Sequence, residues 1–237
     1  MQTAVSWTGV LSPAEWEVIA LSLKVSLVAI TAMLPIAFGL AWVLARTRIP
    51  GKLLLDALVH LPLVLPPVVT GWLLLLAFGA QGPVGRLLSE WLGVSLMFRW
   101  TGAALAAAIM ALPLMVRAMR LSIESVDTRL ESAARTLGAT PWHAFWTVTV
   151  PLALPGLLAG AVLGFARSIG EFGATITFVS NIPGETRTLP LAIYTALQIP
   201  GGESAVTRLA LISVALSLGA LAISELLTRR EERHRRR

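Results

Sequence analysis

The sequence predicts an all-α membrane protein with five transmembrane helices, its N-terminus outside and its C-terminus inside the cytoplasm. Hydrophobic residues make up 56% of the 237 residues and charged residues only 14%, with a mean hydropathy of +0.77. A soluble domain does not reach these values. Five apolar segments are long enough to cross a bilayer, since about 20 helical residues span the hydrocarbon core. Basic residues gather in alternate connections between them, which sets the orientation.

The predicted spans are 18–44, 53–78, 100–121, 151–179 and 205–227. With the N-terminus outside, 13 of the 19 basic residues lie on the cytoplasmic side and four outside, while Lys24 and Arg167 fall within spans. The cytoplasmic residues are Arg46, Arg48, Lys52, Arg117, Arg120, Arg129, Arg135, Arg229, Arg230, Arg233, Arg235, Arg236 and Arg237. This excess of positive charge predicts the cytoplasmic face.

The first span is expected to stay in the mature protein. No basic region precedes it, and Glu15 and Glu17 flank it, which is not the pattern of a cleaved signal peptide. A tight basic turn, "RTRIPGK", follows it.

The second span carries three prolines, Pro62, Pro66 and Pro67. Each lacks an N–H group, so backbone carbonyls are expected to be free at membrane depth near Thr70 and Gly71. Broken helix is tolerated there only against protein or a water-filled cavity. Two interpretations stay open, a simple kink or the wall of a translocation path.

Both outer loops contain short helical segments. The loop at 80–99 includes "VGRLLSEWLG", which has the spacing of an amphipathic helix lying on the membrane surface. The second outer loop includes "LPLAIYTALQIPGG", a helix too short to span. Each could pack at the interface or dock a partner.

No linker or low-complexity tract divides the chain, so residues 1–237 are predicted to form one domain, with a cytoplasmic loop at 122–150 and a basic tail at 228–237. In the loop, Asp127 or Thr128 could cap a helix that Gly138 ends. The apolar stripe of that helix consists of Leu130, Ala133, Ala134 and Leu137.

Trp142 and Trp146 lie four residues apart and therefore share one face of the next helix in this loop. The pair of helices could rest on the bilayer, or it could be a rigid knob offered to a cytoplasmic partner.

The fourth span has small residues at every fourth position: Gly156, Gly160, Gly164 and Ser168. Such a stripe lets another helix approach closely, so we interpret it as a packing face.

Arg167 and Glu171 form the neighbouring stripe of the fourth span. At this spacing the two charges can neutralise one another, so that neither need face lipid. The pair could be structural, orienting the span. It could also keep a translocation path at zero net charge, so that an anion is neither trapped by an arginine nor repelled by a glutamate.

The sequence excludes several kinds of chemistry. A phosphate-binding P-loop is absent, because the Gly51–Lys52 pair has Arg46 and Leu53 where glycine and Ser/Thr belong. No protease motif occurs, the histidines are scattered, and there is no cysteine. We therefore expect a non-enzymatic protein without cofactor or metal.

The segment "SAARTLGATPWHAFWTVTVPLALPG" resembles the EAA loop of ABC importer permeases. The matching positions are Ser132, Ala133, Ala134, Gly138, Val148, Val150 and Pro151. Ser132 stands where the pattern has glutamate, and Glu131 precedes it. The resemblance implies that this loop couples the chain to a separate ATPase. It implies these contact residues: Glu131, Ser132, Ala133, Ala134, Gly138 and Trp142.

The segments "LSLKVS", "HLPLVLPPVVTG", "FARSIGEFGATITFVSNIPGETRT" and "PGGES" are similar to the permease subunits of bacterial molybdate importers. The resemblance implies the type I ABC importer permease fold and alternating access in the plasma (inner) membrane. It also implies a homodimer, cytoplasmic ATPase subunits and an outer molybdate-binding protein. Nucleic acid is not an expected partner. Sulfate and tungstate permeases share the G-E-F-G element.

Within this resemblance, the candidates for the translocation path or gate are Pro66, Pro67, Thr70, Arg167 and Glu171. Two alternatives belong to other classes. One is a secondary transporter in which Glu171 carries a proton, and the other is a membrane adaptor that transports nothing.

Overall fold

The computed structural model describes the backbone of residues 11–235 and the side chains of residues 11–223. This part of the chain is helical and contains no strand. The elements are α1 (Pro13–Arg46), α2 (Lys52–Val64), α3 (Pro67–Phe78), α4 (Pro83–Leu92), α5 (Trp100–Ser125), α6 (Thr128–Thr136), α7 (Pro141–Ala144), the π-helical turn η1 (Phe145–Thr149), α8 (Val150–Ile169), α9 (Gly173–Val179), α10 (Leu189–Leu197) and α11 (Glu203–Arg235).

Four of these segments are long and apolar enough to cross a membrane, and the bent pair α2–α3 makes a fifth if it is counted as one span. This agrees with the predicted number of spans, although the bounds differ: α1, α5 and α11 are longer than predicted. Helix α1 begins at Pro13 because Ser12 caps it: Ser12 Oγ accepts from the Glu15 N–H at 3.2 Å, and Glu15 Oε2 accepts from the Ser12 N–H at 2.8 Å. This reciprocal capping satisfies amide groups at the helix start.

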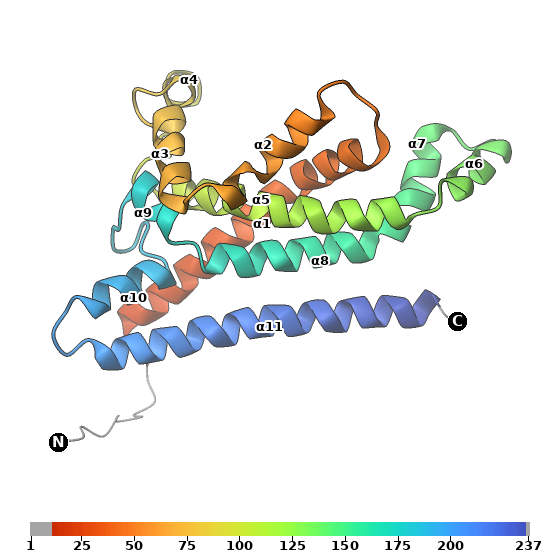
Figure 1. Ribbon diagram of the computed structural model, residues 1–237. Helices are drawn as coiled ribbons and strands as arrows, with labels where there is room; N and C mark the ends of the chain where they lie inside the picture. Colours follow the sequence, from red (N-terminus) through yellow and green to blue (C-terminus); the bar gives the residue numbers. More distant parts are fainter. Residues whose placement is uncertain (1–10, 236–237) are drawn as a thin grey trace.

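The core lies where α5 packs between α1 and α8 (Figure 1). The predicted small-residue stripe of α8 faces α5, which confirms its packing role. A Cβ atom on Gly156 would lie 2.1 Å from Ser122 Cβ, and one on Gly164 would lie 2.7 Å from Met115 Cγ. Close approach of these two helices therefore requires glycine.

The predicted second span is not continuous. Helices α2 and α3 meet at a bend of 117°. The last helical hydrogen bond of α2 runs from Leu65 N to Leu61 O, and Pro66 and Pro67 then remove two successive donors. The prediction placed free carbonyls near Thr70 and Gly71, but these residues lie inside α3, and the break comes a turn earlier.

The predicted fourth span, 151–179, is wrong at both ends. Its helix begins at Pro141 and runs through α7 and η1 into α8, so the second half of the cytoplasmic loop is the first part of the span. Pro151 removes a donor and crowds the preceding turn, and a widened π-helical turn accommodates this. At the other end the helix stops at Ile169, and α9 begins only at Gly173.

The short helices gather toward the ends of the bundle (Figure 1). Helices α6 and α7 lie at the end where α11 finishes, whereas α10 lies at the opposite end, beside the start of α1. The predicted short helices of the outer loops are present as α4 and α10. Helix α2 is tied to α5 by an ion pair between Asp56 Oδ1 and Arg120 Nη1 at 3.1 Å.

The start of α1 and the end of α11 lie at opposite ends of the bundle (Figure 1), as an odd number of crossings requires. Arg236 and Arg237 lie outside the described residues, as do the side chains of the other four tail arginines. We predict that a green fluorescent reporter fused after Arg237 is fluorescent in the cytoplasm, because positive charge is retained there. Alkaline phosphatase fused at the same place should be inactive. The opposite pattern would overturn the assigned orientation.

Candidate translocation site and coupling loop

The two broken spans meet at their breaks. A Cβ atom on Gly173, at the start of α9, would lie 2.7 Å from Pro67 Cβ at the start of α3. One on Gly71 would lie 2.6 Å from the Ala174 carbonyl oxygen and 2.8 Å from Thr177 Cβ. Glycine at both positions thus lets α3 and α9 pack backbone against backbone. Nothing in the local sequence of either span indicates this contact.

Arg167 and Glu171 form the predicted ion pair at this junction. Arg167 Nη1 lies 2.7 Å from Glu171 Oε2, and the glutamate side chain is only 2% exposed. The prediction placed both residues on one helix. Instead, α8 ends at Ile169, and Glu171 lies in the break that follows. Glu171 instead serves both helices: its Oε1 accepts from the Ala174 N–H at 2.8 Å and so caps α9. A carboxylate is favourable there because a helix start leaves amide donors unpaired.

The path candidates from the second span lie on the other side of the same junction. Pro66 and Pro67 are exposed, whereas Thr70 is buried. Thr70 Oγ1 and Ser168 Oγ have no hydrogen-bond partner within the described chain. The structure therefore brings Pro67 close to the break that contains Glu171, and it places two buried hydroxyl groups near the ends of the broken helices.

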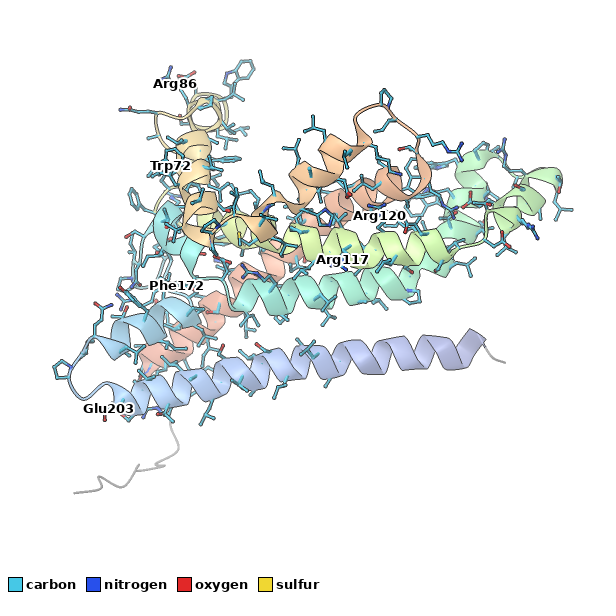
Figure 2. All side chains as sticks on the ribbon, viewed as in Figure 1. Trp72, Arg86, Arg117, Arg120, Phe172 and Glu203 are labelled. Atoms are coloured by element: carbon cyan, nitrogen blue, oxygen red, sulfur yellow. The ribbon has the colours of Figure 1, made fainter. Side chains whose placement is uncertain are left out.

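Helices α3 and α4 project from the bundle at this junction. Figure 2 shows Trp72 and Arg86 on this projection and Phe172 at the break between α8 and α9. The Phe172 ring packs against Tyr194 of α10 with centroids 5.1 Å apart. The break is therefore supported from α10, and sequence reasoning missed this contact between distant segments.

In the predicted cytoplasmic loop at 122–150, the helix α6 begins and ends as its sequence predicts. Asp127 caps α6 by accepting from the Arg129 N–H at 2.9 Å. Gly138 has a φ of +94°, which ends the helix. Trp142 and Trp146 are both more than half exposed, and their rings lie 5.6 Å apart in edge-to-face geometry.

The apolar stripe of α6 is largely exposed. No residue of α6 is buried; Leu130 and Leu137 are 49% and 89% exposed. The coupling-loop candidates Ser132, Ala133 and Ala134 lie on this same helix. An exposed helix with exposed leucines at the end of the bundle is available for a partner or a membrane surface.

Glu131 connects the loop to the bundle. Its Oε1 accepts from Arg46 Nη2 at 3.1 Å and from Thr149 Oγ1 at 2.7 Å. Sequence reasoning singled out Glu131 but missed Arg46 and Thr149. The sequence gives little indication of the Arg46–Glu131 contact. Arg46 is one of several basic residues on the predicted cytoplasmic side, and residue spacing does not show which of them contacts the loop.

We predict that Gly138→Val abolishes binding of the ATPase that the family resemblance assigns to this loop, while the chain still inserts. A β-branched residue is strained at a φ of +94°, so the turn after α6 must change direction. Gly138→Asn should retain most binding, because asparagine tolerates this conformation. A Cβ atom at Gly138 meets nothing within 4 Å, so crowding does not confuse the test. Membrane insertion and co-purification of the ATPase measure the two effects, and full binding by Gly138→Val would contradict the docking role.

Comparisons with known proteins identify the family of this chain. The family model described as "binding-protein-dependent transport system inner membrane component" matches residues 33–233. The chain is 58% identical over 220 residues to the molybdenum transport system permease protein ModB of Escherichia coli K12, covering 93% of this chain and 96% of that protein. It is 54% identical to the ModB protein of Haemophilus influenzae, covering 92% and 96%.

The fold is similar to that of a chain from a bacterial ABC transporter involved in the import of the acidic polysaccharide alginate. The TM-score is 0.71 at 18% identity, covering 93% of this chain and 80% of that chain. At this identity the likeness shows the fold alone, which is the predicted type I ABC importer permease fold. Because the family model matches residues 33–233, which is most of this chain, the chain belongs to the binding-protein-dependent transport system inner membrane component family.

Proposed function

We propose that this chain is the permease subunit of an ATP-driven importer that moves molybdate into the cytoplasm across the bacterial inner membrane. The observation that carries the proposal is the 58% identity to a molybdenum transport permease over 93% of the chain. The sequence has no P-loop, so ATP hydrolysis is assigned to a separate cytoplasmic subunit. The outer partner is a molybdate-binding protein, and the functional unit contains two copies of the permease.

Within this function we assign the translocation path or gate to the junction of α3 and α9. Broken helices at membrane depth occur only against protein or a water-filled cavity, and here two breaks meet. From α3 the junction receives the exposed Pro66 and Pro67 and the buried hydroxyl group of Thr70, while Arg167 and Glu171 contribute charged groups from the other side. The Arg167–Glu171 pair has no net charge, so a dianion passing it is neither trapped nor repelled.

We assign ATPase docking to the exposed face of α6 and the start of α7. Exposed Leu137 and Trp142 supply apolar area, and the residues at the loop pattern, Ser132 to Ala134, lie on the same short helix. Aromatic anchors surrounded by smaller contacts are typical of protein interfaces.

The direct test is uptake of labelled molybdate by proteoliposomes that hold this chain with its native ATPase and outer binding protein. Uptake should require ATP and both partners. Unlabelled tungstate or sulfate, added in excess, would reveal whether the route accepts related oxyanions. ATP hydrolysis without molybdate uptake by the complete system would contradict the proposal.

A secondary transporter that uses Glu171 as a proton carrier predicts a different outcome. Vesicles holding this chain alone should then accumulate the anion when a proton gradient is applied. We expect no such uptake, since both carboxylate oxygens of Glu171 are engaged within the chain, Oε2 by Arg167 and Oε1 by the Ala174 N–H.

A further inference from the structure

Helix α6 is held between two non-helical joints. On one side, Val126 and Asp127 have extended backbone conformations, and on the other Gly138 has a φ of +94°. The helix itself buries no residue, and it packs against α7 and η1. With so little packing, a force applied to α6 could pivot it about its joints without moving the spans.

Three polar contacts oppose that pivot. Arg46, the last residue of α1, donates from Nη2 to the Val126 carbonyl oxygen at 3.0 Å and to Glu131 Oε1 at 3.1 Å. Thr149, at the end of η1, donates from Oγ1 to the same Glu131 oxygen at 2.7 Å. We call Arg46, Glu131, Thr149 and the Val126 carbonyl the Arg46 clamp.

The clamp is partly shielded from water. The side chains of Arg46 and Glu131 are 16% and 30% exposed, and Thr149 is 1% exposed. Charge-assisted hydrogen bonds are shorter and stronger than neutral ones, and a guanidinium can serve two acceptors in a fixed geometry. A partly buried contact of this kind holds its partners more firmly than a surface ion pair does.

We propose that Arg46 is a positioning residue for coupling: it locks α6 to the cytoplasmic end of α1, while Thr149 joins the same Glu131 carboxylate to the start of α8, so that displacement of α6 moves both spans together. This inference rests on the proposed function, in which an ATPase pushes or pulls the loop. Since α1 and α8 both pack on α5, a movement transmitted through the clamp reaches the whole core. Glu131, which lies one residue before the loop pattern, thus binds Arg46 and Thr149 of its own chain.

The test compares Arg46→Met with Arg48→Met in proteoliposomes containing the ATPase and the outer binding protein. Arg48 is a matched control, because it lies two residues away, is exposed and makes no ion pair or hydrogen bond in the described chain. With Arg46→Met, the complex should hydrolyse ATP while molybdate moved per ATP falls about threefold to tenfold. Arg46→Lys should be intermediate, since it keeps the charge but loses the planar guanidinium whose Nη2 reaches both acceptors. Arg48→Met should match the parent.

A merely structural role predicts less assembled complex but an unchanged ratio of molybdate to ATP, and that result would overturn the proposal. If Arg46→Met does not assemble, Thr149→Val removes one contact of the clamp without touching α1. A parent complex that moves no molybdate would instead refute the proposed function.

A second measurement does not depend on transport. The chain has no cysteine, so spin labels can be placed on Gly39→Cys in α1 and Thr136→Cys in α6. Gly39 has open space around its Cβ position, and Thr136 is exposed. The distance distribution between the labels should broaden with Arg46→Met and stay narrow with Arg48→Met. Equal widths in both variants would show that the clamp does not hold α6.

Discussion

Replacing Glu171 by methionine should sharply lower the amount of assembled protein. The change leaves the Arg167 guanidinium without its partner and the Ala174 N–H without its acceptor. Removing one member of a buried pair typically costs about 3–5 kcal/mol, because the remaining charge is uncompensated. Arg167→Met should also lower assembly, but less, since the Glu171 carboxylate would still cap α9. Detergent-solubilised chromatography of the membrane fraction measures the assembled amount.

The double variant Arg167→Met/Glu171→Gln separates folding from transport. It removes both charges, and the glutamine carbonyl can still accept from the Ala174 N–H, so assembly should recover. If the pair only orients the broken helix, molybdate uptake per complex recovers as well; if the pair lines the path, uptake stays low.

Two further variants check that reasoning. Arg167→Met/Glu171→Met should assemble less well than the glutamine version, by about 1–3 kcal/mol for a buried donor left unpaired. Arg86→Met on the projecting α4 is the control for loss of an arginine that is exposed (Figure 2). Single variants at Arg167 and Glu171 that assemble and transport like the parent would show that the pairing argument is wrong.

Adding a single methyl group at Gly156 should disrupt the packing of α8 on α5. The Cβ atom of Gly156→Ala would lie 2.1 Å from Ser122 Cβ and 3.0 Å from the Ala118 carbonyl oxygen. Overpacking of a core costs about 1–3 kcal/mol, and occasionally more where backbone must move. We expect a severalfold loss of assembled protein and a lower unfolding temperature in detergent.

A compensating change at Ser122 tests whether the contact itself is responsible. Ser122→Gly removes the side chain that the new methyl group meets, so Gly156→Ala/Ser122→Gly should recover most of the stability. Gly219→Ala in α11 is the matched control, because a Cβ atom there meets nothing within 4 Å. Equal stability of the Gly156 and Gly219 variants would contradict the close packing of α5 and α8.

Local patterns predicted much of the molecule because their physical causes are local. The five spans follow from apolar length, and the end of α6 follows from a glycine that can adopt a positive φ. The packing stripe on α8 follows from small residues at every fourth position. The Arg167–Glu171 pair follows from spacing and from the cost of an isolated charge in a membrane.

The tertiary structure decided where helices break and which distant groups meet. The prolines predicted a break in the second span, but the bend of 117° and its position depend on what α3 packs against. The fourth span ends at Ile169 with Glu171 capping a separate helix, although its sequence reads as continuous apolar helix. Arg46 reaches Glu131 across 85 positions of the chain. Hydropathy and periodicity describe one helix at a time, whereas these features depend on contacts between helices, and those exist only in the folded chain.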